Sequence, residues 1–211
     1  MPADPNGLVV TLRRPDIALV QQALAQAAAA GALELRVEAA GGPDWTAAGF
    51  APDAAGLLVR PLVQRLDGVG QTEGLGERLG RQLRAGDLVV LTGPLGAGKT
   101  ALTRGIGRGL GVVGAVTSPT FVLARRHVGP VPLLHVDAYR LQQAGAGAEG
   151  LEDLDLDLAL EEGVVVVEWG ALLVEPLSAS RVEVVLSRSA EPADQDRREA
   201  TVRLHGPRWQ V

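Results

Sequence analysis

The sequence predicts an α/β fold whose core holds a mostly parallel β-sheet. Runs rich in valine and leucine lie at residues 88–93, 132–141 and 163–170, each bounded by turn residues. Strands that are apolar throughout are typical of parallel sheets, because such sheets are covered on both faces. Two later runs, 181–187 and 199–206, alternate apolar with polar residues instead. They predict a C-terminal antiparallel strand pair with one face in water.

A domain boundary is predicted near residues 65–72, where glycine and aspartate separate two apolar patterns. The chain has 211 residues, which suits one or two domains of roughly 100 to 150 residues each. We therefore assign residues 66–211 to the main domain and residues 1–65 to a small N-terminal α/β appendage of unassigned role. The appendage is expected to contain an alanine-rich helix and two strands, at residues 14–32, 33–39 and 56–62.

Two further segments of the main domain have helical character. Residues 72–83 precede the first strand of the core, and Thr72 is expected to cap the first turn of a helix there. Residues 149–162 carry seven acidic residues and no basic residue. Leucines at positions 151, 154 and 158 are spaced for one helical face. We interpret this acidic segment either as a solvated surface or as a docking surface for a partner.

Composition and charge narrow the class of protein. The chain is 46% hydrophobic and 21% charged, close to the average for folded soluble proteins. Its net charge of -5 argues against nucleic-acid binding by bulk electrostatics, so any such contact is expected to be shared with a partner. The chain has no cysteine, which excludes disulfides and thiolate metal sites. No targeting segment or membrane-spanning stretch is recognised, and we expect a cytoplasmic protein without membrane contact.

Residues 93–100 read Gly-Pro-Leu-Gly-Ala-Gly-Lys-Thr and match the G-x-x-x-x-G-K-[ST] pattern of a P-loop, between a predicted strand and a helical stretch. The glycines let backbone N–H groups surround a polyphosphate at the positive end of the helix. Lys99 is the only lysine, whereas the other 19 cations are arginine. A compact ammonium reaches β- and γ-phosphates where a planar guanidinium fits less well. Thr100 supplies a hydroxyl for Mg²⁺.

The loop therefore predicts a P-loop NTPase core within the α/β fold. The absence of a second lysine excludes the Asn-Lys-x-Asp motif by which guanine-specific P-loop proteins usually read the base, and no Asp-x-x-Gly switch motif follows the loop. ATP is therefore favoured over GTP. The predicted nucleotide-binding residues of the loop are Gly93, Leu95, Gly96, Ala97, Gly98, Lys99, Thr100 and Ala101.

Two carboxylates end neighbouring apolar strands of the predicted core. Ligands of open parallel sheets lie beyond the carboxyl ends of the strands. Asp137 is in the position from which a Walker-B aspartate holds Mg²⁺, and Glu168 could complete the metal shell or orient the attacking water. Each could instead cap a turn. With Lys99, these two residues form the predicted catalytic set. Trp169, directly after Glu168, is interpreted either as packing at the sheet edge or as part of the site.

Other polar residues near these strands have less specific interpretations. The hydroxyls in residues 117–120 could belong to a loop that senses the γ-phosphate or to a plain connection. Residues 125–127, two arginines and a histidine, are most simply a solvated face. His135 alternates with its strand neighbours Leu134 and Val136, and we interpret it as structural rather than as a ligand.

Taken together, residues 72–111, 116–121, 135–141 and 150–170 resemble the TsaE family of bacterial P-loop ATPases in order and spacing. The resemblance rests on Ser-Pro-Thr-Phe, His-x-Asp-x-Tyr-Arg and Glu-Trp occurring with the P-loop. It implies ATP hydrolysis coupled to a TsaB–TsaD complex. The family acts in forming threonylcarbamoyladenosine beside the anticodon of tRNAs that read codons beginning with adenine, and the resemblance implies that tRNA is reached only indirectly, through the complex. It also implies Thr100, Asp137 and Glu168 around Mg²⁺, Thr72 and Arg198 as nucleotide contacts, and a functional Trp169.

Three positions depart from the family pattern, and none is a predicted ligand. Pro94 stands where an acidic residue is common, Ala138 replaces a leucine, and Gly170 replaces a frequent proline. Residues 1–65 lie outside the resemblance and faintly resemble the C-terminal part of a GNAT acetyltransferase, without a Gly-rich acetyl-CoA loop. Two other functions would use the same P-loop. A small-molecule kinase would be recognised by a phosphorylated product, and a nucleotide-dependent scaffold by ATP binding without turnover.

Overall fold

The computed structural model describes residues 9–13, 17–38, 45, 49–53, 56–119, 123–139, 154–170, 174, 177–188 and 196–209. Two compact units divide the chain: Met1–Gln64 together with Thr201–Val211, and Arg65–Ala200. The last eleven residues thus group with the N-terminal unit, although the sequence assigned them to the main domain. The predicted division into domains at residues 65 and 66 stays a prediction. In the described part of the chain, no helix is long and apolar enough to cross a bilayer.

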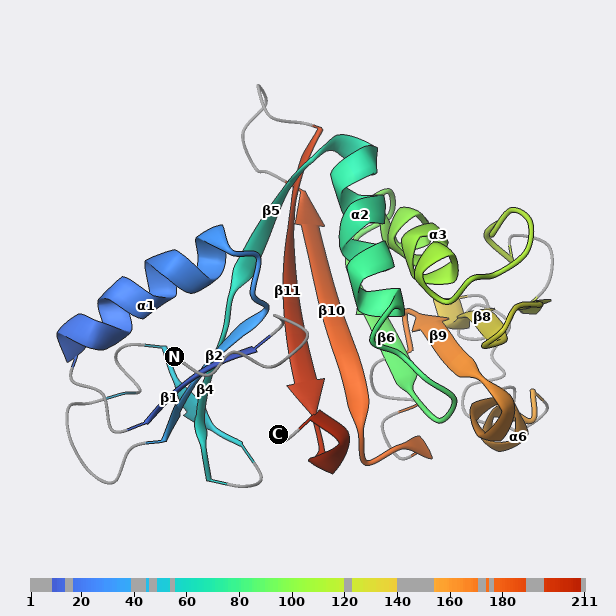
Figure 1. The fold of residues 1–211 in the computed structure, drawn as a ribbon. Helices are drawn as coiled ribbons and strands as arrows, with labels where there is room; N and C mark the ends of the chain where they lie inside the picture. The colour runs from blue at the N-terminus through green and yellow to red at the C-terminus, as the bar shows by residue number, and fades with distance from the viewer. Residues whose placement is uncertain are drawn as a thin grey trace. The chain divides into compact units, whose positions relative to one another are not determined.

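The N-terminal unit contains a four-stranded sheet and one helix (Figure 1). Its elements are β1 (Val9–Arg13), α1 (Ile17–Ala29), β2 (Glu34–Glu38), β3 (Ala51–Pro52) and β4 (Leu58–Pro61). The sheet order is β1-β2-β4-β3; β1 and β2 are parallel and β4 is antiparallel to both its neighbours. The predicted helix and the strands β2 and β4 are confirmed. Strands β1 and β3 were not predicted.

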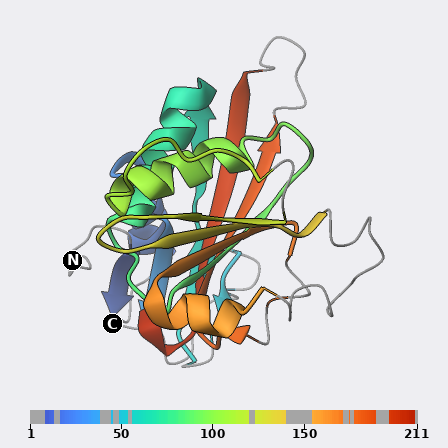
Figure 2. The same cartoon turned by 90° about the vertical axis from the view of Figure 1, so that its right-hand side faces the viewer.

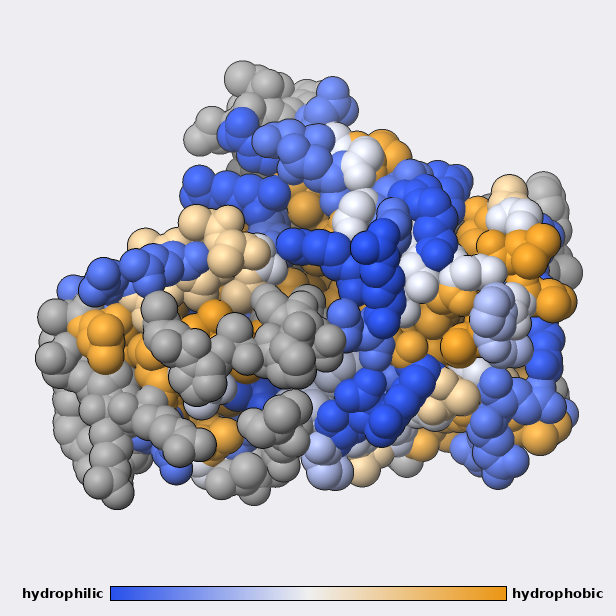
Figure 3. Space-filling view, viewed as in Figure 1, coloured by the Kyte–Doolittle hydropathy of each residue, from blue (hydrophilic) through white to orange (hydrophobic). Residues whose placement is uncertain are grey.

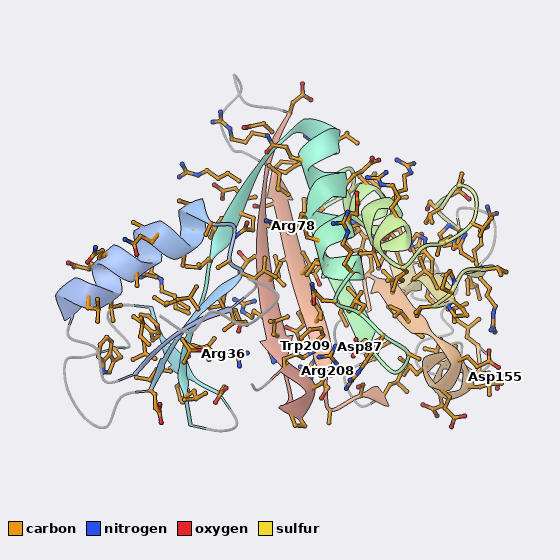
Figure 4. All side chains as sticks on the ribbon, in the orientation of Figure 1. Arg36, Arg78, Asp87, Asp155, Arg208 and Trp209 are labelled. Atoms are coloured by element: carbon orange, nitrogen blue, oxygen red, sulfur yellow. The ribbon has the colours of Figure 1, made fainter. Side chains whose placement is uncertain are left out.

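A buried ion pair lies in this unit. Glu34 and Arg36 of β2 are almost completely buried. Arg36 donates from Nε and Nη2 to Glu34 Oε2, at 3.2 and 3.0 Å, and from Nη1 to the carbonyl of Trp209 at 2.8 Å. The amide of Leu204 donates to Glu34 Oε1 at 2.8 Å. Figure 4 labels Arg36 and Trp209. The pair therefore anchors the C-terminal segment to β2 within the same unit.

A seven-stranded sheet of order β5-β11-β10-β6-β9-β8-β7 carries the P-loop. Strands β10, β6, β9 and β8 are mutually parallel, and β7 is antiparallel to β8. The arrows of β10 and β11 point in opposite directions in Figure 1, as predicted. The elements are β5 (Val63–Asp67), α2 (Gly68–Gly80), β6 (Leu88–Thr92), α3 (Lys99–Gly109), β7 (Ala124–His127), β8 (Leu133–Asp137), α6 (Leu156–Glu162), β9 (Val164–Glu168), β10 (Arg181–Arg188), β11 (Arg197–His205) and the 3-10 turn η3 (Pro207–Trp209). The predicted α/β class and its buried parallel strands are confirmed.

Helices α2 and α3 lie side by side in Figures 1 and 2, and their glycines explain the close packing. A Cβ built on Gly76 would lie 2.2 Å from the carbonyl oxygen of Leu102, and one on Gly105 would lie 2.0 Å from that of Glu73. Only glycine lets two helix backbones approach this closely. Tertiary packing thereby offsets the low helix propensity of these residues.

The outer surface of this helix pair carries charged residues. Glu73 accepts from Arg108 at 2.9 Å, and Glu77 lies 3.7 Å from the same guanidinium and also pairs with Arg81. Figure 3 shows hydrophilic residues over α2. These contacts join the exposed faces of α2 and α3, where single ion pairs contribute little free energy.

The predicted start of α2 is wrong. The helix begins at Gly68 after the N-cap Asp67, so Thr72 is an interior residue and not a cap. Thr72 is fully buried, and its Oγ1 donates to the carbonyl of Gly68 at 3.1 Å. Glycines at positions 68 and 70 resembled a turn in the sequence, but the helix starts at Gly68, whose φ of 81° suits glycine, and includes Gly70.

The helical face predicted for the acidic segment is wrong at Leu158, whereas Leu154, just before the helix, is partly buried against the core and Leu151 lies outside the described residues. Helix α6 begins at Leu156, and it buries Leu156 and Leu160 against Val165 and Val167 of β9. Leu158 is 54% exposed. Residues 149–153 of the predicted segment lie outside the described residues. Val165 and Val167 therefore lie on the face of β9 that α6 covers. Glu168 lies on the opposite face, because side chains alternate along a strand.

Candidate nucleotide-binding site

The loop between β6 and α3 has a backbone that requires glycine at its turns. Gly93, Gly96 and Gly98 have φ values of 147°, 73° and 106°, a region that side chains other than glycine rarely adopt. At Gly93 a Cβ would also lie 2.2 Å from the backbone oxygen of Leu186 on β10. Gly98 is the N-cap of α3. The loop thus curls at the N-terminus of a helix, where backbone N–H groups without intrahelical partners favour an anion.

Lys99 lies in the middle of this loop rather than in solvent. It is only 5% exposed, and its Nζ donates to the carbonyls of Gly93 and Pro94 at 2.9 and 3.1 Å. The ammonium also lies 3.8 Å from the centre of the Trp169 ring. Burial lowers the pKa of Lys99, while the charges of Glu168 and Asp137 oppose that shift. The loop carbonyls and the indole therefore hold a cation at the point where the sequence predicts phosphate.

The two strand-end carboxylates are brought together by strand register. Strands β8 and β9 are parallel, and Asp137 pairs in register with Glu168. Glu168 is 5% exposed, and its Oε1 accepts from Thr100 Oγ1 at 3.1 Å and lies 2.8 Å from His135 Nε2. Asp137 Oδ1 accepts from the amide of Tyr139 at 3.3 Å. The Thr100 hydroxyl and both carboxylates thus meet beside the P-loop.

A cavity of about 500 Å³ joins these groups. Eleven of the predicted site residues line it: Thr72, Leu95, Gly96, Gly98, Lys99, Thr100, Ala101, Asp137, Glu168, Trp169 and Arg198. Two predicted residues, Gly93 and Ala97, shape the loop without lining the cavity. Ala97 is fully buried and its amide donates to the Pro94 carbonyl at 3.1 Å. The cavity combines a positive loop with two carboxylates, the donor set of a site for a polyphosphate and a divalent cation.

Comparison with known proteins identifies the family of this arrangement. The family model described as "Threonylcarbamoyl adenosine biosynthesis protein TsaE" matches residues 66–199. The chain belongs to the TsaE family. It is 55% identical over 139 residues to the tRNA threonylcarbamoyladenosine biosynthesis protein TsaE of Streptomyces coelicolor, covering 64% of this chain and 91% of that protein. The Mycobacterium tuberculosis protein of the same name is 50% identical over 143 residues, covering 65% and 85%.

A solved structure shares the fold of this TsaE chain. The crystal structure of YdiB from Bacillus subtilis superposes with a TM-score of 0.57 at 31% sequence identity. The match covers 71% of this chain and 88% of YdiB. The family model ends before residue 200 and begins at residue 66. The similarity therefore belongs to the part of the chain that forms the cavity.

Thr72 and Arg198, which the TsaE resemblance suggested as nucleotide contacts, both lie against the P-loop. A Cβ on Gly98 would lie 3.4 Å from Thr72 Cγ2 and 3.7 Å from Arg198 Cδ. Arg198 donates from Nη1 to the carbonyl of Asp196, whereas its buried Nε has no partner among the described residues. The structure thus places both side chains next to the first turn of α3.

Trp169 has an unusual backbone as well as a central position. Its φ is 65°, which is uncommon for a bulky residue, and its amide donates to the carbonyl of Leu91 at 3.0 Å. The ring lies under the Lys99 ammonium and 5.3 Å from the ring of Tyr139. Strained residues of this kind persist where the surrounding structure holds them, and they cluster at functional sites. Trp169 therefore belongs to the cavity wall.

Sequence reasoning missed four residues that the structure adds to the site. Val69 and Tyr139 line the cavity. His135 contacts Glu168, and Arg188 donates from Nε and Nη2 to the carbonyl of Gly96 at 3.2 and 3.0 Å. The His-x-Asp-x-Tyr-Arg motif contained a signal for His135 and Tyr139. No sequence signal marks Arg188, because it lies 92 positions after Gly96. Ser118, whose loop was left open, also lines the cavity.

The three departures from the family pattern are accommodated locally. Pro94 contributes its carbonyl, which accepts from Lys99, so its side chain is not needed for this contact. Ala138 is fully buried in the core beside Val136. A Cβ on Gly170 would lie 2.5 Å from a methyl group of Val167. A larger residue at position 170 would therefore require Val167 to move.

Proposed function

We propose that this chain hydrolyses ATP with Mg²⁺ and that hydrolysis supports formation of threonylcarbamoyladenosine in tRNA. The TsaE family supports the role in tRNA modification. The single observation that supports ATP hydrolysis is the convergence of Lys99, Thr100, Asp137 and Glu168 on one cavity beside the P-loop. ATP rather than GTP is proposed because the chain lacks a guanine-reading motif.

In this proposal the P-loop binds the phosphate groups of ATP. Backbone N–H groups of residues 96–100 and the N-terminus of α3 favour negative charge. The Lys99 ammonium has already lost most of its contact with water, so less solvation is given up when phosphate oxygens approach. Charge-assisted hydrogen bonds to phosphate are then stronger than the neutral ones that Lys99 makes with the two loop carbonyls.

The residues at the strand ends fit a hard divalent cation. Mg²⁺ is usually held by one or two carboxylates, a hydroxyl, waters and the substrate phosphates. Thr100, Asp137 and Glu168 offer this oxygen set, and all three line the same cavity. Bound Mg²⁺ would neutralise charge on the phosphates during transfer. Glu168 could alternatively orient the attacking water, which requires only that its carboxylate stay ionised and fixed.

The proposal includes a protein partner and a location. Among the described residues, Arg198 lines the cavity and Arg188 contacts the Gly96 carbonyl, but the sequence offers no obvious arginine finger inside the P-loop core. An arginine supplied by a partner can accelerate hydrolysis by about 10³ to 10⁵. We therefore propose that the isolated chain hydrolyses ATP slowly and is stimulated by a TsaB–TsaD complex, through which it serves tRNA. Because ATP and tRNA are both cytoplasmic, we propose that location.

The test is calorimetric ATP binding to the Lys99→Ala variant. The expected loss is at least about 10-fold in affinity, since each charge-assisted bond contributes about 1.5 to 3 kcal/mol. Arg104→Ala is the matched control, because Arg104 is an exposed cation on the same helix outside the cavity. Unchanged affinity of Lys99→Ala would remove the nucleotide assignment.

A second measurement separates hydrolysis from the kinase alternative. With the TsaB–TsaD complex present, the proposal expects free phosphate as the product of ATP. A phosphorylated small molecule formed in place of free phosphate would favour a kinase. ATP binding without either product would favour a scaffold.

A further inference from the structure

His135 is a polar side chain buried next to the site, with no role in the function proposed above. It lies on β8, is fully buried, and faces the same side of the sheet as Leu133 and Asp137, because side chains alternate along a strand. A Cβ on Gly107 of α3 would lie 3.6 Å from Leu133, which identifies this side as the one that α3 covers. His135 is therefore enclosed between the sheet and α3.

The contacts of Glu168 show why this histidine matters. Its Oε1 has two neighbours that can donate, His135 Nε2 at 2.8 Å and Thr100 Oγ1 at 3.1 Å. Within the described part of the chain, Oε2 of Glu168 has no hydrogen-bond partner. One oxygen is thus fixed from two sides by neighbouring elements, β8 and α3. The other remains available for a water molecule or a cation.

The imidazole can fill this role in one tautomer. A hydrogen on Nε2 lets His135 donate to the carboxylate, and Nδ1 then carries a lone pair. Nδ1 is buried and has no partner among the described residues. An unsatisfied buried lone pair costs less than a missing partner for a carboxylate that is itself 5% exposed. The hydrogen bond to Glu168 therefore explains why a histidine is buried at position 135.

We propose that His135 is a positioning residue that holds Glu168 through Oε1, so that Oε2 is the oxygen presented to the reaction. This inference rests on the proposed ATP hydrolysis. Similar outer contacts of ligands that hold metals change affinity or activity by about 10- to 100-fold when removed. His135 acts through Glu168 and touches neither the P-loop glycines nor the loop carbonyls that bind Lys99, so ATP affinity is expected to stay unchanged.

The experiment compares His135→Leu with His135→Gln. Leucine removes the donor, whereas the amide of glutamine can still donate near the position of Nε2. ATP turnover is measured with the TsaB–TsaD complex, and ATP affinity is measured by calorimetry without magnesium. The expected result is a fall in turnover of about 10- to 100-fold for His135→Leu, partial recovery for His135→Gln, and unchanged affinity for both.

Two controls separate positioning from a general loss of structure. His127 of the adjacent strand β7 is also buried but does not line the cavity, so His127→Leu is expected to change thermal stability without changing turnover. In a Glu168→Gln background, His135→Leu is expected to add no further loss of turnover, because its effect passes through the carboxylate. A crystal structure of His135→Leu without nucleotide is expected to show Glu168 in a changed or multiple side-chain conformation.

The outcomes are decisive in both directions. Parental turnover in His135→Leu would overturn the proposal, as would equal losses for His135→Leu and His135→Gln with weakened ATP binding. An unchanged Glu168 conformation would also overturn it, and this result does not depend on activity. If the parent chain itself fails to hydrolyse ATP with its partners, the proposed function fails, while the crystallographic comparison still tests the positioning role.

Discussion

Two buried glutamates, Glu34 in the N-terminal unit and Glu168 in the unit that carries the P-loop, differ in how their oxygens are satisfied. Oε2 of Glu34 accepts twice from Arg36, and its Oε1 accepts from the amide of Leu204. Glu168 receives both of its donors on Oε1. The exposed fractions, 1% and 5%, are similar. The difference is one of hydrogen bonding and not of burial.

The comparison separates a carboxylate that only stabilises the fold from one that can take part in a reaction. Glu34 has donors on both oxygens and is 1% exposed, which leaves little room for a ligand, and its charge is balanced by a fixed guanidinium. A glutamate held by one oxygen is both oriented and available. Burial raises the pKa of Glu34, although the Leu204 amide and Arg36 act in the opposite direction. The ion pair is thus needed to keep a charge at a site that disfavours it.

The largest effect is expected from Arg36→Met, which breaks the structural member of the comparison. It leaves Glu34 buried without its counter-ion, and we expect a loss of about 3 to 5 kcal/mol in the free energy of unfolding. Denaturant unfolding measures this loss. The double variant Glu34→Leu/Arg36→Met removes both charges and should lose less than Arg36→Met alone. A loss in the double variant as large as in the single variant would mean that packing, not charge, holds the segment.

The same variant has a characteristic pH dependence. The folded-state pKa of Glu34 is raised from the ordinary 4.5, and removing Arg36 raises it further. The stability difference between parent and variant is therefore largest at pH values above the folded-state pKa of Glu34 in the variant. It shrinks as the pH falls and Glu34 becomes protonated, because a neutral carboxyl needs no counter-ion. A difference that grows on acidification would contradict this assignment.

Glu168→Gln sharpens the other member of the comparison. It keeps the shape of the side chain and removes the charge, so we expect partner-stimulated ATP turnover to fall by about 10² to 10⁴. Thermal stability should change less than in Arg36→Met, because the Lys99 ammonium keeps the charge of Asp137 and its bonds to two loop carbonyls. Turnover assays measure the fall in hydrolysis, and calorimetry measures whether ATP affinity changes with it. Parental turnover would show that Glu168, like Glu34, is only structural.

Gly93→Ala tests the backbone conformation of the P-loop, which forms the cavity together with Glu168. Its φ of 147° and a Cβ placed 2.2 Å from the Leu186 oxygen predict a loss of stability of about 1 to 3 kcal/mol. Gly74→Ala in α2 is the matched control, since a Cβ there meets nothing within 4 Å. That control should stabilise the helix by about 0.5 to 1 kcal/mol. Equal melting temperatures for the two variants would contradict the strain at Gly93.

The smallest effect is expected for exposed carboxylates, which complete the series from buried to solvated. Asp157 and Glu161 of α6 are exposed and do not line the cavity. Reversing both charges should leave ATP affinity unchanged and lower affinity for the TsaB–TsaD complex by a few-fold, since exposed pairs contribute about 0.2 to 1 kcal/mol each. Binding measured at low and moderate salt checks this. Unchanged partner affinity would leave α6 as a solvated surface.

Local signals in the sequence were sufficient for the P-loop and for most strands. The P-loop glycines and Lys99 lie within eight consecutive residues. The strands β6, β8 and β9 can be recognised from short apolar runs in the sequence, without knowledge of their contacts with distant residues. By contrast, helix α2 was predicted to start at Thr72 because Gly68 resembled a turn. Its packing against α3, which glycine permits, is invisible to local propensity.

The sequence by itself determined the cradle, the two strand-end carboxylates and the family of this protein. Tertiary structure alone decided the register that pairs Asp137 with Glu168, that His135 reaches Glu168 and that Arg188 reaches Gly96. Each of these contacts depends on strand order and register, which are set by how whole elements pack. A one-residue slip in β8 would turn His135 away from Glu168, because successive side chains of a strand point to opposite faces.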